Sequence, residues 1–244
     1  MRVALFVACF NDVLVPSTGV ATVKLLRRLG VDVDFPQEQA CCGQVHYNSG
    51  YPGAAVPMVR RFATVFAGYD AVVAPTASCV GTVHEQHPRL ARSIGDADLV
   101  EAVDVVRHKT YELATFLTDV LGVEDVGAYY PHRVTYHPTC HSLRGLRVGD
   151  RPLRLLRQVR ALDLVPLPNA EECCGFGGTF AVKNADVSGA MLADKIATIE
   201  ATGASRCTAL DNSCLLHIGG GLRRGHAART VHLAEILAST EADA

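Results

Sequence analysis

This 244-residue chain contains nine cysteines, and their chemistry and spacing make them the candidate functional residues. Eight cysteines form two matching sets of four. The first set is Cys9, Cys41, Cys42 and Cys79, and the second set is Cys140, Cys173, Cys174 and Cys214. Four thiolates brought together suit either a tetrahedral zinc ion or an iron–sulfur cluster. The ninth, Cys207, lies outside both sets, and we interpret it as a small buried core residue.

The two sets belong to one pattern that occurs twice along the chain. Cys-Cys-Gly stands at 41–43 and again at 173–175, with a proline five residues before each cysteine pair. Ser-Cys stands at 78–79 and again at 213–214. The repeat predicts two tandem domains: residues 1–131, which include a connector helix, and residues 132–244.

The adjacent cysteine pairs restrict the kind of site. Neighbouring side chains on a regular strand point to opposite faces, so one site can use both thiols only where the backbone turns sharply. Gly43 and Gly175 directly follow the pairs, and glycine permits such a turn and lets backbone amides approach sulfur. Zinc knuckles use Cys-x-x-Cys pairs, which this chain lacks. The pairs therefore favour an inorganic cluster larger than one zinc ion, and adjacent cysteines form a disulfide only with strain.

Histidines accompany some of the cysteines in sequence. His137 and His141 flank Cys140, and His46 lies just beyond the first cysteine pair. Imidazole can ligate iron or carry a proton near neutral pH. Histidines in such loops more often only form hydrogen bonds, and we interpret all three in this way, with His141 as the strongest candidate for a ligand. The glycines at 175–178 lack the spacing of a phosphate-binding loop, so we expect no nucleotide site.

The elements that position the cysteines alternate between strand and helix patterns. Strands are predicted at 3–7, 31–35, 71–74, 134–136, 164–167 and 206–210, and helices at 16–29, 53–67, 153–160 and 186–201. This alternation predicts an α/β fold with two tandem related parallel-sheet repeats in a pseudo-twofold relation, and cysteine loops at the carboxyl ends of the strands. Residues 99–121 are predicted to form an amphipathic helix that connects the halves.

A series of arginines spaced three or four residues apart follows Cys140. This spacing predicts that the arginines lie on one face of a helix. Such a face is either solvated or docks an acidic partner. The series is Arg144, Arg147, Arg151, Arg154, Arg157 and Arg160.

Composition excludes several classes of protein. With 49% hydrophobic and 20% charged residues the chain is not disordered, and no apolar run approaches the ~18–20 residues of a membrane span. A net charge of −2 with 6% aromatic residues argues against a nucleic-acid surface. The N-terminal MRVALFVACF indicates a buried strand rather than a secretory signal. We therefore expect a cytoplasmic protein, in which cysteines bind metal or act in catalysis rather than form disulfides.

The duplicated Cys-Cys-Gly motif resembles the double-CCG cysteine-rich family, whose members include a subunit of heterodisulfide reductase and iron–sulfur subunits of glycolate and glycerol-phosphate oxidases. Longer stretches narrow the resemblance to the lactate utilization protein A family over nearly the whole chain. These stretches are CCGQVHYNSGY at 41–51, KTYELATFL at 109–117, VLGVEDVGA at 120–128 and CCGFGGTFAVK at 173–183.

One departure from the broad family's pattern affects the expected cofactor. That pattern ends each copy in Cys-x-x-Cys, which gives five cysteines that can hold a non-cubane cluster. Here Thr76 and Asp211 replace the first cysteine of that motif. Four thiolates per copy remain, which suits a four-iron, four-sulfur cluster. The replacements therefore argue against the five-cysteine cluster and against heterodisulfide cleavage, which belongs with it.

The resemblance implies an iron–sulfur subunit that relays electrons from the oxidation of L-lactate to pyruvate and acts with two sister subunits, a ferredoxin-type iron–sulfur protein and a third subunit. It implies an oxidoreductase subunit that is not active alone. The eight repeated cysteines would hold up to two clusters; no flavin or nicotinamide motif is present. A zinc-stabilised interaction module and a thiol/disulfide catalyst remain as alternatives.

Overall fold

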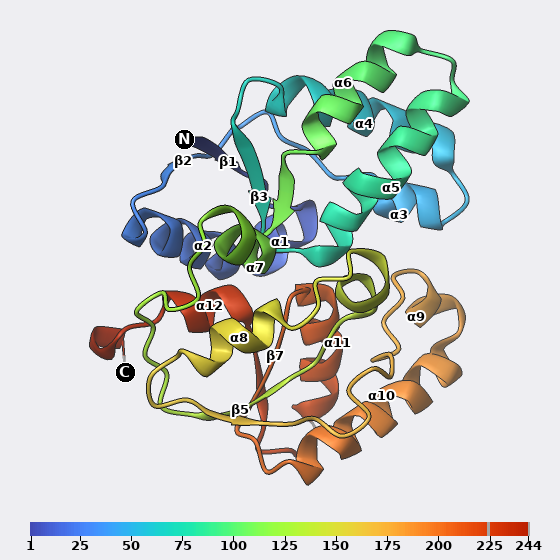
Figure 1. Ribbon diagram of the computed structural model, residues 1–244. Coiled ribbons are helices and arrows are strands. Elements are labelled where there is room, and N and C mark those ends of the chain that lie inside the picture. Colours follow the sequence, from blue (N-terminus) through green and yellow to red (C-terminus); the bar gives the residue numbers. More distant parts are fainter. Residues whose placement is uncertain (224, 244) are drawn as a thin grey trace. The chain divides into compact units, whose positions relative to one another are not determined.

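The computed structural model describes residues 1–223 and 225–243, which fold as two compact units, Met1–Phe116 and Leu117–Ala244 (Figure 1). Each unit contains a four-stranded sheet whose strands are all parallel. The strand order is β2-β1-β3-β4 in the first unit and β6-β5-β7-β8 in the second. The same order occurs twice, which confirms the predicted α/β fold of two related parallel-sheet repeats.

The first unit has a sheet with helices that follow nearly every strand. Its strands are β1 (Arg2–Leu5), β2 (Asp32–Asp34), β3 (Ala71–Ala74) and β4 (Thr110–Glu112). Its helices are α1 (Cys9–Leu14), α2 (Pro16–Arg28), α3 (Gln44–Asn48), α4 (Pro52–Phe66), α5 (Ala77–Ser93), α6 (Ala97–Arg107) and α7 (Leu113–Thr115). All four residues of β3 are buried, as expected for a strand covered on both faces. Phe6 packs edge-on against Phe62 and Phe66, with ring centroids 5.1 and 5.6 Å away.

The second unit repeats this arrangement. Its strands are β5 (Arg133–Tyr136), β6 (Asp163–Val165), β7 (Arg206–Ala209) and β8 (Arg229–His232). Its helices are α8 (Arg151–Arg157), α9 (Phe180–Lys183), α10 (Ala185–Ala201), α11 (Asn212–Leu222) and α12 (Leu233–Ala238), with π-helical turns η1 (Phe116–Val120) and η2 (His141–Gly145) and a 3-10 turn η3 (Glu241–Asp243). A Cβ on Gly221 would stand 2.3 Å from Ile196 Cδ1. The missing side chain therefore lets α11 pack closely on α10.

The predicted connector helix over 99–121 is wrong. Helix α6 ends at Arg107, and the chain then enters β4, which pairs with β3 in parallel and adds a fourth strand to the sheet. Thr110 is fully buried, and its hydroxyl donates to the carbonyl of Val106. The Glu112 carboxylate then caps the next helix by accepting from the Ala114 amide. Strand β4 has only three residues, all of them buried or half-buried. In the sequence so short a stretch cannot be distinguished from the apolar pattern of the helix before it. The domain boundary at 131/132 stays a prediction.

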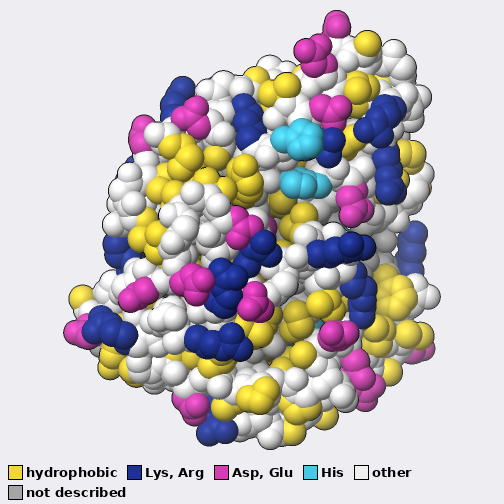
Figure 2. Space-filling model, in the orientation of Figure 1, with side chains coloured by type: hydrophobic (Ala, Val, Ile, Leu, Met, Phe, Trp, Pro, Cys, Tyr) yellow, Lys and Arg dark blue, Asp and Glu magenta, His cyan; other side chains and the backbone are white. Residues whose placement is uncertain are grey.

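The arginines from 144 to 160 do not share one helical face, so that interpretation is wrong. The π-helical turn η2 ends at Gly145, Arg147 has a left-handed φ of 53°, and α8 begins only at Arg151. Three of the arginines form ion pairs within the second unit: Arg151 with Asp119, Arg154 with Glu124 and Arg160 with Glu241. On the face in Figure 2 basic and acidic side chains are interspersed. Both observations favour a solvated surface.

Among the described residues, no helix has the length and apolar character that crossing a membrane requires.

Candidate metal centres

The carboxyl ends of parallel strands bring the first set of cysteines together. Cys9 lies beyond β1 and begins α1, the pair Cys41-Cys42 lies beyond β2, and Cys79 is the third residue of α5, just beyond β3. Because β2, β1 and β3 are neighbours in the sheet, these three connections meet at one edge. The second set follows β5, β6 and β7 in the same way. All eight side chains are free thiols.

The four sulfur atoms of the first set form a continuous series of contacts. Cys42 Sγ lies 3.1 Å from Cys79 Sγ, and the Cys41 thiol contacts those of both Cys9 and Cys42. Hydrogen bonds from Cys42 and Cys9 lower the pKa of Cys41 to about 2. Because Cys41 holds the negative charge, its contacts raise the pKa of Cys9 and Cys42 above the ordinary thiol value. This arrangement stabilises a thiolate that is ready to bind a metal.

The second set has the same series of contacts. The Cys173 thiol contacts those of Cys140 and Cys174, and the Cys174 thiol contacts that of Cys214. Hydrogen bonds from Cys140 and Cys174 lower the pKa of Cys173 to about 2. The pKa of Cys140 and that of Cys174 are raised, mainly by their contact with Cys173. Each unit thus brings together the four cysteines that the repeat predicted as a set.

The glycine after each cysteine pair turns the backbone sharply, as the sequence predicted. Gly43 has φ +85° and Gly175 has φ +89°, a left-handed conformation that favours glycine. The Gly43 amide donates to Cys41 Sγ at 3.4 Å, and the Gly175 amide donates to Cys173 Sγ at 3.3 Å. The turn therefore directs both thiols of a pair toward one site and places an amide donor on one of the sulfurs.

The residues that replace the family's fifth cysteine connect the loops of each site. The Asp211 carboxylate is buried and accepts a hydrogen bond of 2.6 Å from the hydroxyl of Thr139, which precedes Cys140. In the first unit Thr76 accepts from the side-chain amide of Asn11 at 2.9 Å. Thr76 and Asp211 each stand directly before the helix that carries the last cysteine of the set. Both positions therefore fix the first cysteine's loop against that helix.

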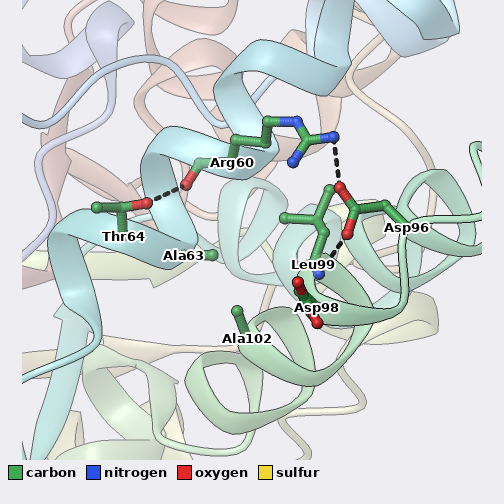
Figure 3. A pocket seen from close by; sticks show the side chains of 7 residues that line it. All are labelled: Arg60, Ala63, Thr64, Asp96, Asp98, Leu99 and Ala102. Carbon is green, nitrogen blue, oxygen red and sulfur yellow. Dashed lines mark hydrogen bonds and ion pairs between the residues drawn. The ribbon is translucent and has the colours of Figure 1, made fainter.

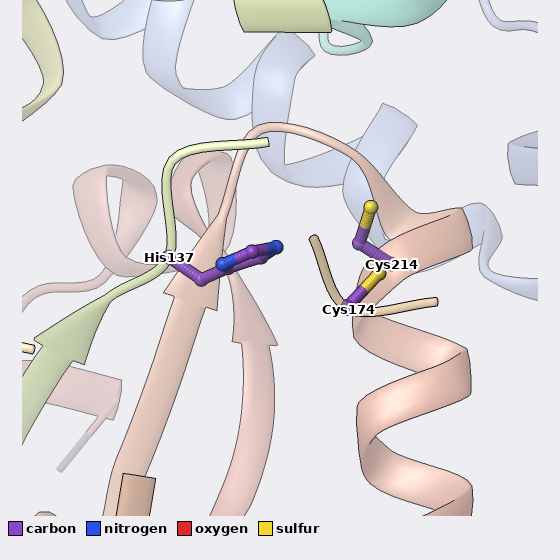
Figure 4. Close-up of side chains that lie close together, drawn as sticks. All are labelled: His137, Cys174 and Cys214. Atoms are coloured by element: carbon purple, nitrogen blue, oxygen red, sulfur yellow. The ribbon is translucent and has the colours of Figure 1, made fainter. Parts of the chain in front are cut away.

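His137 differs from the prediction that it only forms hydrogen bonds. Its side chain is 1% exposed, and neither ring nitrogen has a hydrogen-bond partner among the described residues. Its ring extends toward the sulfur atoms of Cys174 and Cys214 (Figure 4), and the possible ligand atoms of the three residues lie within 4.8 Å of one another. Desolvation lowers the pKa of His137 to about 4, which keeps the ring neutral. The interpretation from sequence missed this residue because it favoured His141, which is exposed.

His46 and Cys207 are the remaining candidate residues. His46 is half-buried, and its Nδ1 has no hydrogen-bond partner among the described residues. Cys207 is 0% exposed and belongs to the core cluster of the second unit with Ile199 and Ile218. Burial raises the pKa of Cys207 to about 12. The prediction that Cys207 is a core residue is therefore confirmed.

A surface pocket of about 300 Å³ in the first unit has no cysteine in its lining (Figure 3). It is lined by Arg60, Ala63, Thr64, Asp96, Asp98, Leu99 and Ala102. The Arg60 guanidinium and the Asp96 carboxylate form an ion pair of 2.6 Å across it. Asp96 also caps α6 by accepting from the Leu99 amide. Arg60 and Asp96 therefore satisfy one another and the end of the helix.

The repeated sheets and the gathered cysteines define a protein with tandem cysteine-rich domains. The model of the CCG cysteine-rich domain matches residues 3–84 and 134–219. The chain belongs to the lactate utilization protein A family. It is 48% identical to Lactate utilization protein A of Geobacillus kaustophilus and 47% identical to that of Geobacillus thermodenitrificans, in each case over 97% of this chain and 98% of the relative. The relative from Bacillus velezensis is 43% identical over 98% of this chain and all of its own length.

The fold also resembles a solved structure of distant sequence. A crystal structure of a hypothetical protein from Helicobacter pylori superposes with a TM-score of 0.58 at 13% identity, and the match covers 97% of this chain and 48% of that one. At this identity the similarity concerns the fold alone.

Proposed function

We propose that this chain is the iron–sulfur subunit of a cytoplasmic system that oxidises L-lactate to pyruvate, and that it relays electrons through two cysteine-ligated clusters. The observation that carries the proposal is the pair of four-thiol sets, each gathered at the carboxyl edge of a parallel sheet. Relatives named Lactate utilization protein A, 47–48% identical over 97% of the chain, support the metabolic role. Sister subunits of such a system would supply and accept the electrons.

The residues present fit an iron–sulfur cluster by the chemistry of their donors. Cys9, Cys41, Cys42 and Cys79 would hold one cluster, and Cys140, Cys173, Cys174 and Cys214 would hold the other. Each set contains one thiol whose pKa is lowered to about 2 and an amide that donates to the same sulfur. Complete ligation by four thiolates is the usual coordination of a four-iron, four-sulfur cluster, which supplies one-electron transfer when bound.

The surrounding protein would hold the ligands in place and limit the access of water. Cys42, Cys79 and Cys174 are buried, whereas Cys9 is exposed. Each site therefore has at least one cysteine shielded from water, and in the first site Cys9 reaches the surface. The amides on Cys41 and Cys173 stabilise negative charge on sulfur. Such amides tune the reduction potential of a cluster.

A zinc-stabilised interaction module is the second candidate function. The observation that favours it is the group of His137, Cys174 and Cys214, because mixed cysteine and histidine ligands are typical of zinc sites. Zinc has no redox chemistry. In that case the metal would stabilise the loops, and the surface would recruit other subunits.

Growth on lactate tests the electron relay. A bacterial strain that depends on this chain for growth on L-lactate is supplied with the wild type, with Cys174→Ala or with Cys207→Ala. Cys207 is the matched control because it is equally buried and lies outside both sets. We expect Cys174→Ala to abolish growth on lactate and Cys207→Ala to retain it, with both proteins folded. Growth of the Cys174→Ala strain at the wild-type rate would contradict the proposal.

A further inference from the structure

The two candidate centres have the same cysteines but different surroundings. His137 stands three residues before Cys140, and Phe6 stands three residues before Cys9. Each of these residues lies just beyond an inner strand of its sheet: His137 follows β5 and Phe6 follows β1. The same position is therefore an apolar ring in the first unit and an imidazole in the second.

The long helix that comes after each Cys-Cys-Gly turn repeats this difference. In the first unit Phe62 on α4 packs against Phe6, with ring centroids 5.1 Å apart. In the second unit Lys195 on α10 is 1% exposed, and its Nζ donates to the carbonyl of Asn169 at 2.9 Å. The charge of Lys195 acts on His137 and on the thiols of Cys173 and Cys174. The second unit thus has two buried polar side chains where the first unit has two buried aromatic side chains.

Burial of His137 without a partner has a physical cost. A buried polar group that forms no hydrogen bond costs about 1–3 kcal/mol of stability, and His137 has two unpartnered nitrogens among the described residues. Phe6 shows that an apolar side chain fits the same place in this fold without that cost. A bound metal would satisfy one imidazole nitrogen, because neutral imidazole is a common ligand of zinc and iron.

We propose that His137 is a metal ligand of the second unit, next to Cys174 and Cys214, so that this chain carries two chemically different centres. The first centre has four thiolate ligands. In the second centre the imidazole of His137 takes the place of one of the four thiolates, so that three thiolates and one imidazole bind the metal. The inference rests on the proposed function in one respect, the presence of a metal in the second cysteine set. The geometry that carries it is the group of three ligand atoms within 4.8 Å and the ring drawn toward both sulfurs in Figure 4.

Pulsed electron paramagnetic resonance on the full chain tests this ligand. The chain is produced with ¹⁵N-labelled histidine against a ¹⁴N background, reconstituted anaerobically with iron and sulfide, and reduced. A histidine nitrogen bound to the cluster gives a strong ¹⁵N hyperfine coupling, whereas backbone amides remain ¹⁴N. This measurement needs no substitution, so it does not depend on whether a variant folds.

Two variants assign the coupling. His137→Phe gives the second unit the side chain that the first unit has at this position, and His141→Phe is the matched control beside Cys140. We expect a strong ¹⁵N coupling in the wild type, its loss in His137→Phe and its retention in His141→Phe. An iron–sulfur signal without ¹⁵N coupling in the wild type overturns the ligand inference and leaves the proposed function intact. A coupling that persists in His137→Phe overturns the assignment to His137.

A cobalt experiment separates failure of the inference from failure of the proposed function. If no iron–sulfur cluster assembles, the chain is loaded with Co²⁺ and examined by proton NMR. A strongly shifted, solvent-exchangeable imidazole N–H resonance that His137→Phe removes supports His137 as a ligand while contradicting the iron–sulfur function. The absence of such a resonance from the Co²⁺-loaded wild type overturns the ligand inference.

Discussion

Replacement of Gly175 by alanine tests whether the cysteine pair depends on a turn that only glycine fits. Gly175 has φ +89°, and an added Cβ would stand 2.6 Å from the carbonyl oxygen of Ser188 and 3.0 Å from Met191 Cβ. Gly203, in the same unit, also has a positive φ, +63°, but a Cβ there would meet nothing within 4 Å. Both substitutions therefore place a residue with a Cβ in a left-handed backbone conformation. Only Gly175→Ala also brings the Cβ into collision with α10.

The expected losses follow from these two contributions. A left-handed backbone costs a residue with a Cβ roughly 1–2 kcal/mol, which is the whole effect expected for Gly203→Ala. The Ser188 carbonyl belongs to the backbone of α10 and cannot rotate away, so Gly175→Ala also has to displace the helix. Overpacking of this kind costs about 1–3 kcal/mol. We expect Gly175→Ala to lower the free energy of unfolding by about 2–5 kcal/mol in total.

Urea unfolding of the metal-free proteins, followed by circular dichroism, measures this difference. Gly43→Ala in the first unit gives an intermediate case, because its Cβ would approach Ala55 only, with the methyl nearest at 3.2 Å and backbone atoms at 3.6 Å. We expect Gly175→Ala to lose at least about 1 kcal/mol more than Gly203→Ala. Equal losses for the two substitutions would refute the argument that the turn is held against α10.

Three further predictions concern the loops, the surface and the thiols. Asp211→Ala is expected to lower the free energy of unfolding by about 1–3 kcal/mol, because it removes the hydrogen bond that the Thr139 hydroxyl donates to a buried carboxylate, and Asp211→Asn is expected to lose less in the same urea assay. Hydrogen bonds from Arg151 lower the pKa of Asp119, so Asp119→Asn should cost about 0.5–1 kcal/mol at pH 7. That cost should begin to fall as the pH drops below the ordinary carboxyl value of 3.8, and it should vanish once the pH is below the lowered pKa of the folded Asp119, where its carboxylate is protonated; a constant cost would contradict the ion pair. In the metal-free chain iodoacetamide should label the partly exposed Cys41 well before the buried Cys207, and metal should protect only Cys41, as read by peptide mass spectrometry.

Much of the fold could be predicted from the sequence because the central strands are continuous apolar runs bounded by clear stops. Strand β3 was predicted at 71–74, and the structure places it at Ala71–Ala74. The edge strands β4 and β8 were missed because each leads directly into a helix, at Leu113 and Leu233. Only their pairing with β3 and β7 distinguishes them from helical sequence, and this pairing is a long-range property.

The candidate site could be predicted in part for a similar reason. The cysteine sets follow from the repeat, since equivalent residues of two related domains occupy equivalent places. The role of His137 could not be predicted from its neighbours in sequence, because its burial depends on the tertiary fold, and the charge that acts on it belongs to Lys195, which is 58 residues away. When the two halves are aligned at Cys9 and Cys140, His137 lies opposite Phe6. This difference between the halves is the sequence signal that could have indicated a special role for His137.

Chemical analysis of the reconstituted chain tests the central claim most directly. The full chain is reconstituted anaerobically with iron and sulfide and analysed for iron, sulfide and zinc, together with Cys42→Ala, Cys174→Ala and the control Cys207→Ala. We predict about four iron and four sulfide per cysteine set, so that each set variant retains about half of the wild-type content and Cys207→Ala retains all of it. A colourless protein with stoichiometric zinc and no sulfide would contradict the account.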